Sequence, residues 1–226
     1  MAKRFYEQVS VAEATEGYEV HLDGRVLKTP GKRVLILPER RHADCVAKEW
    51  DAQEDDIRPE IMPCTRLVNV AIEQTPDHRE RLIHEARNYA ATDLLCYRAS
   101  EPTGLVERQA QMWDPLLKWA ADQGIALQTT QSALAIEQEG AALACVAERV
   151  SGMDDLHLTL CVHLIAVYGS AILGLAVMAG HIDGETALSL SRLDELWQIE
   201  HWGEDEEAKQ RADNITAEVK ALCTLL

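Results

Sequence analysis

The chain has 226 residues, and 47% of them are hydrophobic, which is enough apolar material for a substantial core in one larger domain or two small ones. Its formal net charge is −16, from 38 acidic and 22 basic residues. This charge repels nucleic acid and anionic membrane surfaces, so the totals argue against nucleic-acid binding and favour a basic or amphiphilic protein partner.

The cysteines carry no sign of a metal site or of a disulfide framework. The six residues include no closely spaced pair and no His–Cys cluster at metal-ligand spacing. We therefore expect reduced core thiols in a cytoplasm-like compartment. The N-terminus shows neither an apolar signal core nor an Arg- and Ser-rich presequence, so we expect that the chain as given is not exported.

The first part of the chain predicts a small antiparallel sheet. Residues 18–22 alternate in polarity, Asp23-Gly24 is a turn signal that needs positive φ at both positions, and residues 25–29 return. The apolar run 34–37 adds a further strand. A sheet of three or four strands needs a covering helix, and the helical pattern that ends near Trp50 supplies it.

Helical patterns dominate the rest of the chain. Residues 93–98 are too short and too apolar to assign by period, and they could be a strand that completes the sheet. Residues 104–123 predict a long amphipathic helix in which Pro115 is either a kink or a new helix start. Residues 125–130 favour a strand, and every segment from about residue 136 onward favours a helix.

The apolar run 158–180 is long enough to cross a membrane. Acidic residues flank it on both sides, and no Lys or Arg stands at its ends to set an orientation. Small residues four apart, at Ala166, Ser170 and Gly174, would let another helix approach closely. We therefore expect a buried helix of a bundle and no membrane insertion.

Together these patterns predict an α+β fold in two parts. Residues 1–130 form an N-terminal portion with a small antiparallel sheet and helices, and residues 131–226 form a mostly α-helical C-terminal domain. Helices within residues 63–90 could pack with the C-terminal part.

The strongest candidate for a site is the stretch 191–208. On one helix, Leu190, Leu193, Leu196 and Trp197 share a face, and Glu200 falls in the middle of that face. Gly203 suits a left-handed C-terminal cap, and the acids after it suit the first turn of another helix. The pattern predicts a helix corner with two tryptophans and many carboxylates. The alternative is that Glu200 reaches water at the helix end and the acids form an ordinary solvated face.

Motifs of catalysis are missing. The sequence has no phosphate-binding glycine loop, no Gly-x-Ser-x-Gly elbow and no His-Glu-x-x-His. His157 and Cys161 could share a helix face, but they lack a third ligand. A small acidic metal-dependent hydrolase using Asp194, Glu195 and Glu200 is the alternative, although neither a nearby His nor regular oxygen-ligand spacing supports it. We expect no enzyme, no catalytic residue, no cofactor and no metal.

Binding of a protein is the better hypothesis for the acidic corner. Surface aromatic residues anchor protein contacts, and acids around them favour basic partners. The predicted partner-binding residues are Asp194, Glu195, Trp197, Gln198, Glu200 and Trp202.

Several short motifs, taken in order, resemble one known family. They are Lys3-Arg-Phe-Tyr6, residues 18–30, Glu49-Trp50, Met62-Pro63 with Thr65-Arg-Leu67, residues 92–98, Trp113-Asp-Pro115 and residues 191–203. This set spans almost the whole chain in order and resembles the ATP-twelve assembly chaperones that bind the alpha subunit of the catalytic head of F-type ATP synthase. Residues from about 131 to 153 show no distinctive match.

The resemblance implies a chaperone for the F1 sector that holds unassembled alpha subunit until the beta subunit replaces it. It also implies that an acidic position in the last motif, Glu195 or Glu200, serves the chaperone function. Eukaryotic members work in mitochondria, and the missing presequence points to a bacterial member in the cytoplasm. We expect the free protein to be a monomer.

Overall fold

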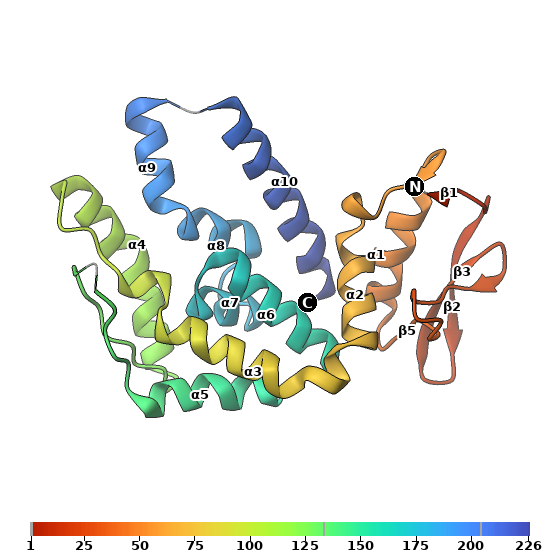
Figure 1. The fold of residues 1–226 in the computed structure, drawn as a ribbon, viewed down its shortest axis with the longest axis horizontal. Helices are drawn as coiled ribbons and strands as arrows, with labels where there is room; N and C mark the ends of the chain where they lie inside the picture. The colour runs from red at the N-terminus through yellow and green to blue at the C-terminus, as the bar shows by residue number, and fades with distance from the viewer. Residues whose placement is uncertain (1, 133, 204) are drawn as a thin grey trace. The chain divides into compact units, whose positions relative to one another are not determined.

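The chain forms two compact units. Figure 1 shows the ribbon coloured by residue number from the N-terminus to the C-terminus. The computed structural model describes residues 2–132, 134–203 and 205–226. Unit 1 contains residues 1–78 and 220–226, and unit 2 contains residues 79–219. The expected α+β class is confirmed, with a small antiparallel sheet near the N-terminus followed by helices.

Unit 1 is built on the small antiparallel sheet. Strand β3 pairs with β2 along one edge, and β4 and β5 pair with different parts of its other edge. Asp23 and Gly24 have φ values of 48° and 75°, which is the positive φ at both hairpin positions that Asp-Gly favours. The strands are β2 (Val9–Ala14), β3 (Gly17–Leu22), β4 (Arg25–Val26) and β5 (Ile36–Leu37), and a separate pair joins β1 (Ala2–Lys3) to β6 (Asp56–Ile57).

Helices of unit 1 cover the sheet. Helix α1 (Arg40–Asp51) contacts β2, β3 and β5, and α2 (Pro63–Glu73) packs on α1. The carboxylate of Glu49 accepts hydrogen bonds from the backbone N–H groups of Cys64 and Thr65, at 2.7 and 2.8 Å, and so caps the N-terminus of α2. Two short 3₁₀ helices, η1 (Pro59–Ile61) and η3 (Cys223–Leu225), complete the unit.

Cys45 of α1 and Cys64 of α2 are joined by a disulfide, with their Cα atoms 6.6 Å apart. The expectation that all six cysteines are reduced is therefore wrong for this pair. The two residues are 19 positions apart, and such a spacing carries no pairing signal by itself. Only the packing of α2 on α1 brings the sulfur atoms together. Cys96, Cys145 and Cys161 are not part of a disulfide, as expected.

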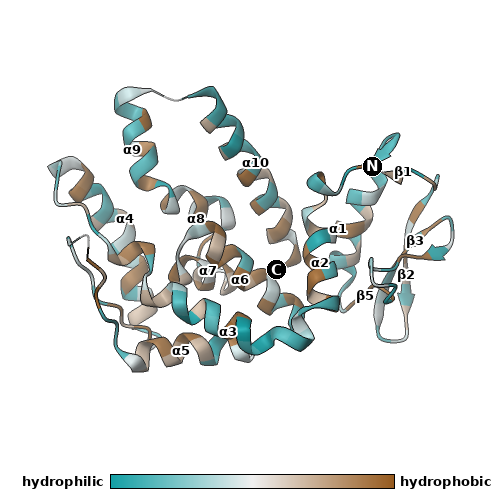
Figure 2. Cartoon of the chain, in the orientation of Figure 1, coloured by the Kyte–Doolittle hydropathy of each residue, from teal (hydrophilic) through white to brown (hydrophobic). Residues whose placement is uncertain are grey.

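Unit 2 is helical. Its elements pack around α6 and α7, which Figure 2 shows as mostly hydrophobic. Its long helix α4 contacts α7 and α9, so residues 103–121 belong to the helical unit 2. The elements are α3 (Thr75–Ala91), η2 (Leu94–Cys96), α4 (Thr103–Ala121), α5 (Gly140–Ser151), α6 (Asp155–Tyr168), α7 (Ala171–Met178), α8 (Gly184–Ser191), α9 (Leu193–Trp202) and α10 (Glu206–Leu222), of which α3 and α10 begin or end in unit 1.

The apolar run 158–180 forms two helices and not the single one expected. Gly169 takes a φ of 64° and ends α6, and Ser170 caps α7 by accepting a hydrogen bond from the N–H of Leu173. Gly174 allows the close approach expected of a small residue, because a Cβ there would collide with Ile165 of α6. In the described part of the chain, no helix combines the length and the apolar character that crossing a membrane requires.

A buried carboxylate replaces the strand considered for residues 93–98. Asp93 is fully buried and accepts hydrogen bonds from the N–H of Leu95 and of Ile172, each at 3.0 Å, and from the hydroxyl of Ser170 at 2.8 Å. The bond to Leu95 caps the 3₁₀ turn η2, so the backbone cannot continue as a strand. Residues 125–130 were expected to form a strand, but they form only an isolated β-bridge, between Thr130 and Tyr97.

Candidate functional site

The predicted acidic corner lies on α9, which contacts both α4 and α8 in unit 2 (Figure 1). The sequence predicts one helix through Leu190 and Trp202, but the backbone breaks at Arg192, where φ is −105° and ψ is 17°. Gly203 ends α9 with φ of 87° and ψ of 167°, so its φ is positive but the backbone is not the left-handed cap that was expected. Acids then open α10, and Asp205 accepts a hydrogen bond from the N–H of Ala208 at 3.1 Å.

A groove of about 550 Å³ runs between α4, α8 and α9. Leu190, Leu193 and Leu196 line it despite the helix break, whereas Trp197, the fourth residue of the apolar face predicted from the sequence, does not. Met112 of α4 also lines the groove and is 44% exposed. Among the charged residues that line it are Arg108 and Glu200. This groove, called the acidic groove below, therefore offers an apolar floor beside charged side chains.

Each predicted carboxylate accepts a hydrogen bond from a donor within the protein. Asp194 accepts from the side-chain amide of Gln109 at 2.7 Å, and Glu200 pairs with Arg108 at 2.7 Å. Glu195 accepts from both Nε and Nη2 of Arg192, at 2.8 and 2.9 Å. The side chains of Glu195 and Glu200 remain 46% and 51% exposed, so a partner can still reach them.

These hydrogen bonds keep the corner ionised. The hydrogen bond from Arg192 is the main reason that the pKa of Glu195 is lower than usual. The hydrogen bond from Arg108 lowers the pKa of Glu200 in the same way, and the pKa of Arg108 is raised in return. Both carboxylates therefore carry full negative charge at neutral pH.

The two tryptophans have different surroundings. Trp197 is partly buried: the Arg108 guanidinium lies 4.7 Å from its ring centre, and His201 stacks on it at 4.5 Å. A Cβ at Gly104 would lie 2.7 Å from the same ring, so α4 approaches Trp197 closely. Trp202 is 78% exposed. Trp197 thus supports the corner, whereas Trp202 and the exposed Gln198 are open to a partner.

Sequence reasoning missed the contribution of α4. Arg108 and Gln109 hold Glu200 and Asp194 from positions 92 and 85 residues earlier in the chain, and no local pattern links them. One signal was available: Gln109 is a polar residue on the apolar side of a predicted amphipathic helix, and it is 1% exposed. Such a residue needs a polar partner from another element.

The alternative of a metal site at the corner is not supported. Among the described residues, Cys45, Glu49 and Cys64 are the single group of three or more candidate ligands that lie within 4.8 Å of one another. The carboxylates of α9 do not converge in this way. In the group that does, the two cysteines form a disulfide and Glu49 already caps α2. Neither place presents the open ligand set that a metal-dependent hydrolase needs.

Comparison with known proteins points to one family. Residues 3–121 match the family model described as ATP12 chaperone protein. Protein atp12, mitochondrial, of Schizosaccharomyces pombe is 23% identical over 221 residues, which is 92% of this chain and 76% of that protein.

Solved structures agree with the family match and extend it over both units. The crystal structure of Atp12 from Paracoccus denitrificans is 40% identical, with a TM-score of 0.91 over 99% of this chain and 97% of that one. Atu1473, a putative chaperone from Agrobacterium tumefaciens, is 37% identical, with a TM-score of 0.93 over 99% of this chain and 84% of that one.

Proposed function

Because the chain belongs to the ATP12 chaperone family and is an ATP synthase assembly chaperone, we propose that its client is the unassembled alpha subunit of the F1 sector. It holds this subunit until the beta subunit replaces it. Family membership also confirms that the chain is a chaperone and not an enzyme. We further propose that the free protein is a monomer in the bacterial cytoplasm. The similarity to proteins of Paracoccus denitrificans and Agrobacterium tumefaciens supports the bacterial origin.

The observation that carries the proposal is the acidic groove with Trp202 beside it. A groove of about 550 Å³ with a leucine floor can accept the apolar face of a helix or loop. Ionised carboxylates next to it favour basic residues on that segment. Trp202, at 78% exposure, is a large apolar side chain that lacks cover in the free protein and can anchor a contact.

Client binding would rearrange the ion pair between Arg108 and Glu200. A carboxylate has about four acceptor positions, so Glu200 can receive an Arg or Lys of the client beside Arg108 or in its place. Arg108 also lies over the ring of Trp197. Displacing it would therefore uncover an aromatic face next to the new partner. Asp194 and Glu195 would contribute charge nearby, and Gln198 a polar contact.

Covering a subunit interface fits the chemistry of an assembly factor. A subunit that waits for its partner exposes an apolar surface, and such surfaces aggregate. The sequence has no motif for using ATP, so release must come from a competitor. We propose that the beta subunit binds the same surface of the alpha subunit more tightly and displaces the chaperone.

Calorimetric titration of purified alpha subunit into the chaperone tests this proposal. Reversing the charge at the corner with Glu200→Lys should weaken binding at least about tenfold, because it places two cations side by side and repels basic residues of the client. The matched control is Glu148→Lys, which makes the same charge change at an exposed position on α5 outside the groove. Equal affinities of the two variants would remove Glu200 from the client site, and no binding by the wild type would remove the client.

A further inference from the structure

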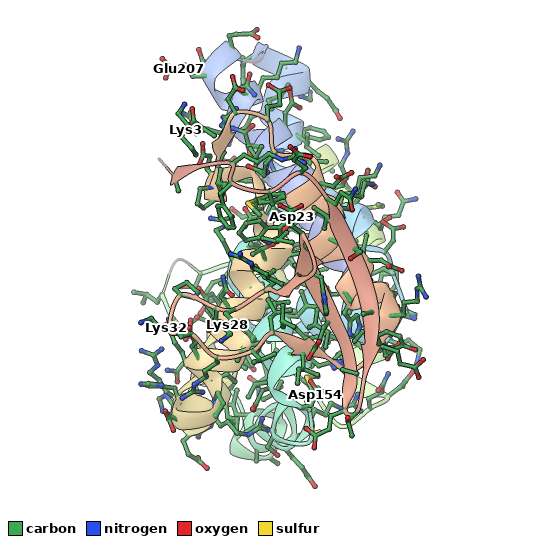
Figure 3. All side chains as sticks on the ribbon, turned by 90° about the vertical axis from the view of Figure 1, so that its right-hand side faces the viewer. Lys3, Asp23, Lys28, Lys32, Asp154 and Glu207 are labelled. Atoms are coloured by element: carbon green, nitrogen blue, oxygen red, sulfur yellow. A yellow bond between two sulfur atoms is a disulfide. The ribbon has the colours of Figure 1, made fainter. Side chains whose placement is uncertain are left out.

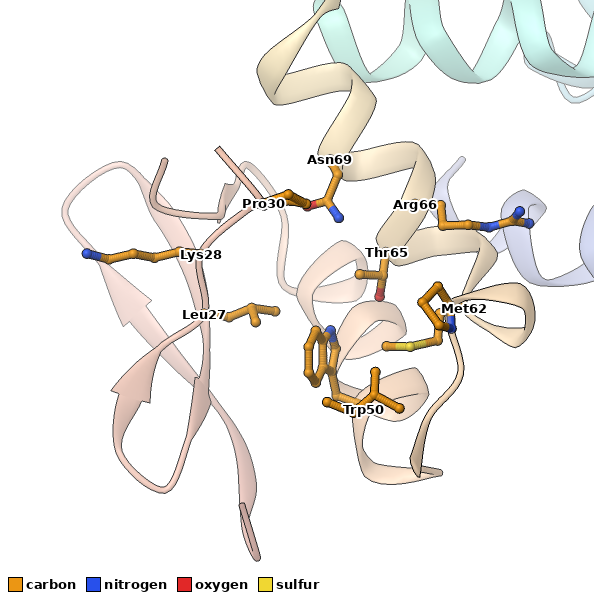
Figure 4. Close-up of a pocket in the computed structure, with 10 residues that line it drawn as sticks. Leu27, Lys28, Pro30, Trp50, Met62, Thr65, Arg66 and Asn69 are labelled. Carbon is orange, nitrogen blue, oxygen red and sulfur yellow. The ribbon is translucent and has the colours of Figure 1, made fainter. Parts of the chain in front are cut away.

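Unit 1 contains a second groove, which the acidic corner does not explain. It has a volume of about 370 Å³ and lies between the loop after β4 and the helices α1 and α2 (Figure 4). Leu27, Pro30, Trp50 and Met62 line it with apolar surface. Ile61, next to Met62 in the chain, is 49% exposed. This groove is called the indole groove below.

One polar atom in the groove lacks a partner. The Nε1 of Trp50 is buried, and among the described residues it makes no hydrogen bond. A buried indole N–H nearly always donates to an acceptor, so the atom marks a place where an acceptor belongs. Figure 4 shows the Trp50 ring standing between Leu27 and Met62, with Thr65 and Asn69 of α2 above it. The amide of Asn69 offers both a donor and an acceptor to the same space.

The loop beside the groove is basic, although the whole chain has a net charge of −16. Residues 25–33 carry cations at Arg25, Lys28, Lys32 and Arg33 and no acid of their own, and the carboxylate of Glu73 of α2 accepts a hydrogen bond from the N–H of Gly31 in this loop. The side chain of Lys28 points away from the floor of the groove (Figure 4), and Lys32 extends from the same loop (Figure 3). Of the cations in this loop, Lys28 lines the groove, as does Arg66 of α2, so a ligand in the groove would meet positive charge at its edge.

We propose that the indole groove binds an extended segment of the client in which an apolar side chain is followed by an acidic residue. The apolar side chain packs against Leu27 and Met62, a backbone carbonyl of the segment accepts the hydrogen bond from Trp50, and the acidic residue lies near Lys28. The inference rests on the proposed function, since it assigns a second contact to the same client. A peptide fits better than a fatty acid, because the donor inside the groove is neutral and the cations lie outside it.

The test fills the groove without disturbing the core around it. Asn69→Phe projects a ring into the indole groove, and we expect it to weaken binding of purified alpha subunit about tenfold. Val70→Phe is the matched control on α2, at an exposed position that does not line the groove, and it should change affinity less than about twofold. In parallel, the indole resonance of Trp50 is followed by NMR in the full chain labelled with ¹⁵N-tryptophan, assigned with Trp50→Phe.

The resonance separates the possible occupants. Supporting results are a shift of the Trp50 signal on adding alpha subunit to the wild type and a much smaller shift in Asn69→Phe. Equal affinity of the two α2 variants, or a signal that moves with oleate and not with alpha subunit, would overturn the proposal. If the wild type does not bind alpha subunit, the proposed function fails. The proposal for the indole groove is then tested separately, by adding the capped peptide Gly-Leu-Leu-Asp-Gly and following the Trp50 signal. A shift with this peptide but not with its Lys counterpart supports the groove, and no shift overturns it.

Discussion

The two grooves differ in whether their polar groups have partners within the free protein. In the acidic groove of unit 2, the charge of Glu200 already has a partner within the protein, Arg108. In the indole groove of unit 1, the N–H of Trp50 has no partner among the described residues. A client at the first groove meets a carboxylate that is already paired, whereas a client at the second groove supplies an acceptor for a hydrogen bond that the free protein does not make. Charge should therefore govern encounter at the acidic groove, and fit should govern binding at the indole groove.

In each unit a carboxylate accepts hydrogen bonds from the N-terminus of a helix, and the two carboxylates differ in burial. Glu49 caps α2 in unit 1 and is half-buried, and Asp93 holds the start of α7 in unit 2 and is fully buried. Burial raises the pKa of both carboxyls, and it raises the pKa of Asp93 to about 6. The start of α7 in unit 2 thus depends on a fully buried acid whose ionised form is unfavourable.

The largest expected effect is a pH dependence of stability that comes from Asp93. Because its folded pKa lies above the unfolded value of 3.8, its contribution to stability is fully present below pH 3.8 and is lost as pH rises through about 6. The loss amounts to about 3 kcal/mol, because each pH unit between the folded and unfolded pKa values corresponds to about 1.4 kcal/mol. Urea denaturation between pH 4 and 7.5 should show this fall in the wild type but not in Asp93→Asn. The same fall in both proteins would assign it to other groups, and Glu49→Gln tests the counterpart in unit 1.

The next effect concerns the exposed anchor of the acidic groove. Trp202→Ala should weaken binding of alpha subunit by about 2 kcal/mol, because an indole at an interface contributes more than most side chains. Leu134→Ala is the matched control, since both side chains are 78% exposed in the free protein. Calorimetric titration measures both variants, and thermal unfolding should show both as stable as the wild type. A loss of affinity of similar size for Leu134→Ala would contradict a specific role for Trp202.

The smallest effect separates the two grooves by salt. Raising NaCl from about 0.05 to about 0.5 M should weaken binding of alpha subunit several-fold, because screening acts on the exposed charges of the acidic groove. Asn69→Phe should keep this salt dependence, since it changes only the indole groove. Glu200→Lys should flatten or invert it. If Asn69→Phe flattens the dependence instead, the assignment of charge and fit to different grooves is wrong.

Local signals in the sequence were enough for much of the fold. Asp23-Gly24 predicted its hairpin because the φ preferences of two adjacent residues decide that turn. The start of α10 followed in the same way from Gly203 and the acids behind it. The break at Arg192 was missed, because a short interruption hardly alters the spacing of Leu190 and Leu193.

The candidate site was predictable on one side only. The apolar floor and the acids of α9 lie close in sequence, so periodicity could place them together. Their partners Arg108 and Gln109 lie on another helix, and no spacing rule reaches that far. The indole groove was not foreseen at all, because the missing partner of Trp50 becomes visible only when everything around the ring is in place.

The sequence by itself determined the hairpin at Asp23-Gly24, the helical character of most of the chain and the motifs that resemble one chaperone family, because each of these depends on residues close together in the chain. The net negative charge follows from composition alone. Only the tertiary structure decided that Cys45 meets Cys64, that Asp93 is buried at the start of α7, and that Arg108 covers Glu200 and Trp197. The physical reason is that the burial of a side chain and its pairing with another depend on which elements pack around it. That arrangement is set by how helices pack on one another, and a linear pattern along one helix does not contain it.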